Sequence, residues 1–195
     1  MKLWMMMLAL MMISLPAYAQ GGLSLGKPGY GGPGCPGGTA AVALSRDGKN
    51  LSLRFVRYQV AAGGARSFDR KSCNLAIPVH VPAGQSVSIL SVAYRGFNRL
   101  PASAKSEFQV ESFFSGGRGP VFKRSFPGPQ QGVFAVAENA AVTSGVWSAC
   151  GADVILRINS SLLVNSGNGQ TASASVASQD VRTAAIIYSL QSRHC

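Results

Sequence analysis

The apolar residues of this chain recur at every second position over short segments, which is the pattern of β-strands with one buried face. The segment 154–165 shows the pattern most clearly, because five apolar residues share one face: Val154, Leu156, Ile158, Leu162 and Val164. Comparable segments occupy 39–45, 51–60, 75–81, 85–96, 107–114, 171–177 and 181–191. About nine short strands joined by Gly- and Pro-containing turns predict an all-β antiparallel β-sandwich, with a β-barrel as the alternative.

Turn-forming residues divide these segments. Asp47 and Gly48 form a hairpin signal between the first two segments. Pro78 cannot donate a hydrogen bond to a neighbouring strand, so we expect 75–81 at a sheet edge. The segment 114–132 is rich in Gly, Pro and basic residues and is long for a connection inside a compact domain. We expect it to cross between two sheets, with a functional loop as the alternative.

The first 19 residues have the features of a secretory signal peptide. Lys2 precedes an apolar run of 13 residues, Leu3 to Leu15, and an Ala-Tyr-Ala cleavage sequence follows. We therefore expect cleavage between Ala19 and Gln20. A membrane anchor is the alternative, but the run is shorter than the roughly 20 residues that span a membrane, so we favour the signal peptide. The mature form is therefore predicted to lack a transmembrane segment and to be secreted, either extracellular or periplasmic.

The remaining chain divides at its first cysteine. Residues 20–34 are rich in Gly and Pro and are expected to form a flexible N-terminal segment, followed by a single β-sandwich domain at 35–195. The chain has four cysteines, Cys35, Cys73, Cys150 and Cys195, and in an exported protein these predict two disulfides. Three pairings exist. We favour Cys35–Cys73 and Cys150–Cys195, because each closes one end of the chain onto its own half.

Charged residues are few, and most of them are basic. Eighteen Lys and Arg face seven acids, for a net charge of +11 that becomes +10 without Lys2, while charged residues are only 13% of the chain. Such a balance favours adhesion to anionic polymers or membrane surfaces, although a basic exported protein without such a partner is an equal alternative. No nucleic-acid partner is expected, because no recognition helix or RNP-like aromatic pattern is visible.

Catalytic patterns are weak. The two histidines, His80 and His194, lie beside no glycine-flanked nucleophile, which argues against a Ser-His-Asp triad. Glu107 and Glu111 share a strand face but lie about 13 Å apart, farther than the two carboxylates of a glycosidase. The cysteine spacing contains no C-x-x-C pair and argues against a zinc site. We therefore predict a protein that is not an enzyme and uses no cofactor or metal.

Candidate ligand-binding residues come from two segments. Positive residues concentrate at 46–71, and among them Arg54 and Arg57 lie on a predicted strand. The sequence AYRGF at 93–97 places aromatic and basic side chains together, and these could stack and bind a sugar. The candidates are Arg54, Arg57, Tyr94, Arg95 and Phe97. For AYRGF we favour a structural interpretation over the sugar-binding one, with Gly96 forming a turn while Tyr94 and Arg95 flank the edge of the strand. Trp147, near Cys150, is expected to pack in the core.

Four blocks in order resemble the exported proteins grouped as domain of unknown function 4360 (DUF4360). They are GCPGGTAAVALSRDGKNLSLRFVRYQV at 34–60, RKSCNLAIPVHVPAGQSVSILSVAYRGF at 70–97, VWSACGADVILRIN at 146–159, and the terminal RHC. The resemblance implies a secreted, disulfide-linked β-protein and carries over no catalytic residues.

Two functions remain from the sequence. The first is a secreted, non-enzymatic binding or adhesion module for an anionic polysaccharide or another polymer of the cell envelope or extracellular space. The second is a secreted effector or inhibitor that acts on a protein partner through its loops, especially 114–132. Neither the pattern nor the composition predicts an oligomeric state.

Overall fold

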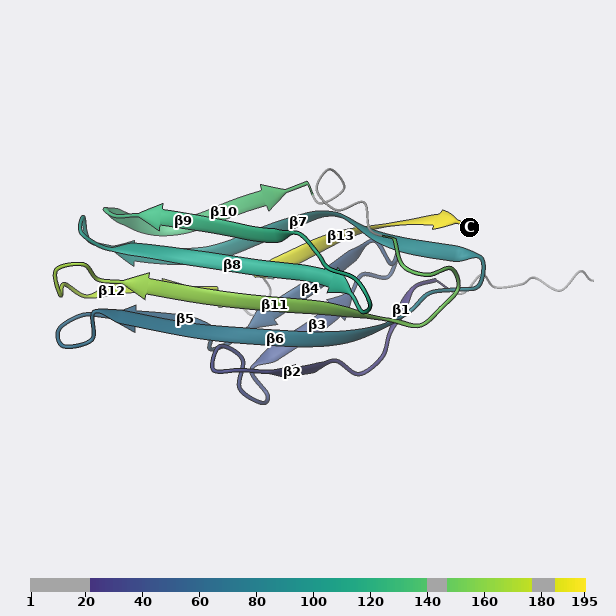
Figure 1. Ribbon diagram of the computed structural model, residues 1–195, viewed down its shortest axis with the longest axis horizontal. Coiled ribbons are helices and arrows are strands. Elements are labelled where there is room, and N and C mark those ends of the chain that lie inside the picture. Colours follow the sequence, from purple (N-terminus) through teal and green to yellow (C-terminus); the bar gives the residue numbers. More distant parts are fainter. Residues whose placement is uncertain (1–21, 140–146, 177–184) are drawn as a thin grey trace, which may run out of the picture.

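The chain forms a β-sandwich in the computed structural model, which describes residues 22–139, 147–176 and 185–195 (Figure 1). Its strands make two separate antiparallel sheets, and no helix occurs among these residues. The predicted all-β sandwich is confirmed, because the strands form two sheets rather than one closed barrel. The predicted signal peptide at 1–19 and its cleavage site lie outside the described residues. No helix in the described part of the chain is long and apolar enough to cross a membrane.

The first sheet, called sheet A, has the strand order β1-β6-β11-β8-β9, and β2 also pairs with β6. Its strands are β1 (Ser24–Leu25), β2 (Gly29–Gly31), β6 (Phe68–His80), β11 (Val154–Asn165), β8 (Lys105–Phe114) and β9 (Val121–Pro127). The second sheet, sheet B, has the order β3-β4-β13-β7-β12-β5, with β10 paired to β7. Its strands are β3 (Ala40–Leu44), β4 (Asn50–Phe55), β13 (Ile186–His194), β7 (Gln85–Leu100), β12 (Ala172–Ser175), β5 (Gln59–Ala62) and β10 (Gln130–Glu138).

The core lies between the two sheets and follows the alternation of the sequence. On β11 the predicted face points inward: four of its five apolar residues are buried, and Val154 packs against them. On β8 the inward residues include Phe108, Val110 and Phe114. Each inward side chain leaves water when the sheets pack, and full burial of such a residue contributes about 1.5–3 kcal/mol relative to its exposed state. The period of two thus predicts which side of each strand is buried.

The N-terminal segment joins the domain rather than preceding it. Residues 22–34 were expected within a flexible segment, but the structure pairs β1 and β2 with β6. The backbone N–H of Gly34 donates to the carbonyl of Ser72 at 2.8 Å. A side chain at Gly34 would overlap the ring of Tyr58, so this glycine permits the close approach. The strands of the domain therefore begin at Ser24 and not at Cys35.

Pro78 lies inside sheet A, and the prediction of an edge strand is wrong. It pairs with Ile155 of β11 on one side of β6, and Gly26 donates a 2.9 Å hydrogen bond to its carbonyl on the other. Gly26 belongs to the interval between the short strands β1 and β2. The missing N–H of Pro78 therefore falls where β6 has no regular strand partner on that side, which makes the proline tolerable there.

Both disulfides have the predicted pairing. Cys35 and Cys73 are joined with their Cα atoms 5.3 Å apart, and both are fully buried. Cys150 and Cys195 are joined with their Cα atoms 6.1 Å apart, and both are exposed. The first links the N-terminal segment to β6, and the second anchors the end of the chain after β13.

The segment 114–132 contains the predicted crossover and also a strand. It begins with a turn, continues as β9 at the edge of sheet A, and passes through a cis peptide bond between Gly128 and Pro129 into β10 of sheet B. Phe126 of β9 and Phe134 of β10 have ring centroids 4.5 Å apart. These two rings link the sheets along one side of the sandwich, so the segment has a structural role.

Candidate functional site

The most distinctive surface lies on the outer face of β7, at the end of the sandwich where it pairs with β10 and β12. Successive residues of a strand point to opposite faces, so Arg95, Phe97 and Arg99 share one face. Both arginines are exposed and Phe97 is half-buried, while Tyr94 and Asn98 point into the core. Phe97 is therefore flanked along its own strand by two guanidinium groups, and we call these three residues the β7 strip.

On the inner face of sheet B, behind the β7 strip, the ring of Phe134 packs against Gly96. Gly96, between Arg95 and Phe97, pairs with Phe134 of β10. A side chain at Gly96 would overlap the Phe134 ring and the Ser175 carbonyl oxygen. Gly96 therefore lies within a continuous strand and does not form the expected turn. Its missing side chain gives Phe134 room beneath β7.

Tyr94 belongs to the same internal cluster. Its ring stacks on Phe122 of β9 with centroids 4.4 Å apart and contacts Phe108 of β8 edge to face. The residue is 3% exposed, and burial raises the pKa of its phenol well above the usual range. Tyr94 therefore joins the sheets in the core and is not available to a surface ligand.

A groove of about 520 Å³ opens beside the β7 strip. It runs across the strands, from Phe97 and Arg99 on β7 over β12 and β5 to β6 and the turn before it. Among the described residues of its lining, the basic groups are Arg66, Lys71 and Arg99, and the one acid is Asp69. Gln59, Ser173 and Ser175 add neutral polar groups. An anion in this groove would meet three cationic side chains from three separate elements of the chain.

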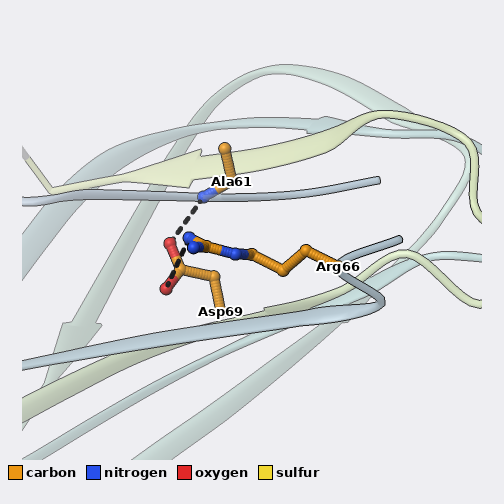
Figure 2. A network of polar contacts seen from close by, with 3 residues as sticks. All are labelled: Ala61, Arg66 and Asp69. Carbon is orange, nitrogen blue, oxygen red and sulfur yellow. Dashed lines mark hydrogen bonds and ion pairs between the residues drawn. The ribbon is translucent and has the colours of Figure 1, made fainter. Parts of the chain in front are cut away.

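Asp69, in the lining of the groove, contacts Ala61 and Arg66, and Figure 2 shows both contacts. One carboxylate oxygen accepts a 3.0 Å hydrogen bond from the backbone N–H of Ala61, on the unpaired side of edge strand β5. The other lies 4.0 Å from the guanidinium of Arg66. The Asp69 side chain is 17% exposed and that of Arg66 is 71% exposed. Asp69 therefore satisfies an edge-strand donor, while the Arg66 guanidinium stays accessible to solvent.

Three turns meet at the same end of the sandwich, on the left in Figure 1: those joining β5 to β6, β7 to β8, and β11 to β12. The N–H of Gly64 donates to the carbonyl of Gly169 at 2.7 Å. The hydroxyl of Ser103 donates to the side-chain oxygen of Asn168 at 2.6 Å. These hydrogen bonds fix the three turns to one another. They therefore also hold in place the turn between β5 and β6, which carries Arg66.

The charged side chains on the outer face of the described strands of sheet B are all basic. By strand alternation, none of the described strands of this sheet carries an Asp or Glu on that face. Sheet A differs, because Glu107 and Glu111 lie on the outer face of β8. Glu107 pairs with Lys123 at 3.0 Å, and Glu111 accepts a 3.5 Å hydrogen bond from Asn159. An anion is therefore favoured on the outer face of sheet B over that of sheet A.

The structure brings three of the five predicted ligand-binding residues onto one face. Arg95 and Phe97 belong to the β7 strip. Arg54 on β4 is exposed on the same face, and it lies level with Arg95 because Leu53 and Tyr94 both pair with Ile186. Arg57 is exposed in the bend after β4. The fifth candidate, Tyr94, points into the core.

The sequence interpretation did not single out Arg99, Arg66 and Lys71 as candidate ligand residues. Arg99 could have been found by extending the alternation of 93–97 by one more step, had Gly96 not been read as a turn. Arg66 and Lys71 belong to the basic segment 46–71, but only the fold places them beside β7. The residues that line the groove are spread along the sequence from Gln59 to Ser175. A local sequence pattern could therefore not have predicted that they lie together.

Other potential chemistry is dispersed. His80 pairs with Asp153 on the exposed surface, far from any groove wall described above. Within the described ranges, no cluster of three or more His, Cys, Asp or Glu side chains could hold a metal ion. Trp147 is half-buried rather than fully in the core, and the Arg193 guanidinium lies 4.0 Å from its ring centroid. This cation–π contact lies next to the Cys150–Cys195 disulfide.

Comparison with known proteins identifies one curated relative. An uncharacterized secreted protein of Arthroderma benhamiae is 35% identical over 134 residues. The match covers 67% of this chain and 55% of that protein. The chain therefore spans little more than half the length of the relative.

Two solved structures show a weak overall likeness. TmCBM61 in complex with beta-1,4-galactotriose is 12% identical, with coverage of 86% of this chain and 88% of that chain and a TM-score of 0.29. The family 11 carbohydrate-binding module from Clostridium thermocellum, in complex with a beta-1,3-1,4-mixed-linked tetrasaccharide, is 9% identical, with coverage of 87% and 85% and a TM-score of 0.23. Both scores lie below those of chains that share a closely superimposable fold.

The chain also matches the model of a protein family. The family model described as "Domain of unknown function (DUF4360)" matches residues 22–195. This range contains every described strand, both disulfides, the β7 strip and the groove. The chain therefore belongs to the DUF4360 family.

Proposed function

We propose that this protein is an exported, non-enzymatic binding module that holds an anionic polysaccharide against the outer face of sheet B. The observation that carries the proposal is the β7 strip, in which Phe97 lies between Arg95 and Arg99 beside a groove that holds two further cations. The C–H face of a sugar ring is apolar and packs on an aromatic side chain. Guanidinium groups bind carboxylate or sulfate through paired, charge-assisted hydrogen bonds.

The number and placement of the carboxylates favour binding over hydrolysis. Glycoside hydrolysis ordinarily uses two carboxylates that flank the scissile bond. The described lining of the groove contains one, Asp69, and its oxygens are directed at Ala61 and Arg66. Glu107 and Glu111 lie on the other sheet and serve a cross-strand ion pair and a hydrogen bond. The secreted relative and the predicted signal peptide support export.

Binding to polygalacturonate, which carries carboxylates, and to dextran sulfate tests the proposal, with uncharged dextran as the reference. We expect binding to one or both anionic polymers at low salt, weakening as salt screens the charges. Phe97→Ala should weaken binding by about tenfold or more, as loss of a central aromatic contact does. Arg99→Gln should weaken it several-fold.

Arg157→Gln is the matched control. Arg157 is exposed on the outer face of sheet A, so its replacement removes the same charge from the opposite surface. It should leave polymer binding nearly unchanged. Equal losses in Arg99→Gln and Arg157→Gln, or no binding to either anionic polymer at low salt, would contradict the proposed site.

A further inference from the structure

The direction of the groove indicates how a polymer would lie in it. Hydrogen-bonded registers place four residues side by side on four successive strands: Gln59 with Ser175, Ser175 with Phe97, and Phe97 with Val133. All four occupy outward positions by strand alternation. Gln59 and Val133 are exposed, Phe97 is half-buried, and Ser175 is 8% exposed within the groove lining. Neighbouring strands are about 4.8 Å apart, so this row spans about 14 Å, which is longer than one sugar ring. We call it the transverse row.

Cations flank the transverse row on both sides. Arg99 lies two residues beyond Phe97 on β7, and Arg95 lies two residues before it. Each is therefore about 7 Å from Phe97 along the strand. Within the row itself the groups are apolar or neutral. A polymer that crosses the strands would place its rings over Phe97 and Val133 and direct anionic substituents toward the two arginines.

Both ends of the row are open. Val133 lies on β10, an edge strand of sheet B, and is 73% exposed. At the other end, Gln59 lies on edge strand β5, and the groove continues past that edge to Lys71 of β6. A binding surface that accepts only a chain end needs a wall there. The groove lining ends on β7 at Phe97 and Arg99 on one side, and the transverse row continues from Phe97 to the exposed Val133 at the β10 edge.

Resting on the proposed function, we infer that the site binds an internal segment of an anionic polysaccharide, with the chain running across the strands along the transverse row. A chain lying along β7 instead would leave the groove, whose lining extends over β12 and β5 to β6. Several sugar residues then contribute to affinity together, and free chain ends are not required.

The test measures affinity for galacturonate monomer, dimer, tetramer and hexamer by calorimetry on the full mature chain. If the inferred path is correct, affinity rises by about tenfold or more from dimer to hexamer, and reduction of the hexamer's terminal aldehyde leaves it unchanged. Val133→Glu should weaken hexamer binding by about tenfold while sparing the dimer. Val121→Glu is the control, because Val121 is an exposed valine (54%) on β9 of sheet A.

Three outcomes would overturn the inference, and they differ in what else they affect. If affinity does not depend on length while Phe97→Ala still abolishes it, the ligand binds by one unit and only the path is wrong. If Val133→Glu and Val121→Glu behave alike in hexamer binding, the chain does not reach β10. If no galacturonate or dextran sulfate binds at any length, the proposed function fails together with the path.

Discussion

The hydroxyl of Tyr188 on β13 lies 2.8 Å from the hydroxyl of Ser112 on β8, and this hydrogen bond joins the two sheets inside the core. Tyr188 is fully buried and Ser112 is nearly so. In a second pair, the hydroxyls of Tyr58 and Ser160 are 3.1 Å apart, which links the connection between β4 and β5 of sheet B to β11 of sheet A. The sandwich therefore contains hydroxyl pairs within an otherwise apolar interior, and a buried polar group costs free energy when it loses its partner.

Replacing Tyr188 with Phe should lower the free energy of unfolding by about 1–3 kcal/mol, because the Ser112 hydroxyl is left buried without a partner among the described residues. Tyr58→Phe should cost less, since Ser160 keeps its 3.0 Å hydrogen bond to the carbonyl of Cys73. Urea unfolding followed by circular dichroism measures both. The double variant Tyr188→Phe/Ser112→Ala should recover part of the loss, and no recovery would contradict the pairing.

Buried tyrosines should make the fold sensitive to alkaline pH. Burial raises the pKa of Tyr58 to about 12, against the opposing effects of the Ser160 hydrogen bond and the nearby Arg70 charge, and it also raises the pKa of Tyr188. Unfolded tyrosine ionises near pH 10. Above that pH the unfolded chain releases protons that the folded chain retains, so stability is full below about pH 10 and falls toward pH 12.

The measurement for this prediction is the urea midpoint between neutral pH and pH 11, with tyrosinate absorbance recorded in parallel. The absorbance of the buried tyrosines should appear together with loss of the native circular dichroism. The Tyr188→Phe variant should show a shallower fall with pH, because it has one fewer buried phenol. Full ionisation of all tyrosines in a protein that keeps its native spectrum would contradict the prediction.

Gly96→Ala should destabilise the protein by about 1–3 kcal/mol and weaken polymer binding, because the added methyl group overlaps Phe134 and the Ser175 carbonyl. Gly29→Ala is the control: Gly29 lies in strand β2, and a methyl group there meets no atom within 4 Å. Thermal unfolding of the two variants gives the comparison. Equal melting temperatures would show that β7 adapts to a side chain at position 96.

The two disulfides should differ in their reaction with thiols. Cys150 and Cys195 are exposed, whereas Cys35 and Cys73 are fully buried, and exchange requires access to a sulfur atom. Under mild reduction of the native protein, an alkylating reagent should label Cys150 and Cys195 first. Peptide mapping by mass spectrometry follows the order. Labelling of Cys35 and Cys73 at the same rate would indicate that the whole domain opens before reduction.

Asp69→Asn should raise affinity for an anionic polymer several-fold, because it removes the one acidic charge among the described residues that line the groove. The asparagine oxygen can still accept the hydrogen bond from Ala61, so the edge strand stays satisfied. Asp69→Ala removes both the charge and the acceptor and should also reduce stability. Calorimetric titration with polygalacturonate, beside thermal unfolding, separates the two effects. Lower affinity in Asp69→Asn would assign Asp69 a direct role in ligand contact.

The class of fold and the buried faces could be predicted from the amino-acid sequence, and the favoured disulfide pairing is the observed one. Alternation is a local property of the chain, so the inward residues of β8 and β11 follow from spacing alone. The pairing of Cys35 with Cys73 and of Cys150 with Cys195 agrees with the principle that each bridge closes one end of the chain.

Which strands are neighbours follows from long-range packing, and this arrangement creates the candidate site. Pro78 became acceptable inside sheet A because Gly26 and the break between β1 and β2 face it. Gly96 became part of a strand because Phe134 needs the space beneath it. Tyr94 and Phe97, close in the sequence, lie on opposite faces of β7, while Gln59 and Ser175 meet beside Phe97. The register of such pairs depends on packing between segments that are distant in the sequence. The alternation of residues along one strand gives no information about it.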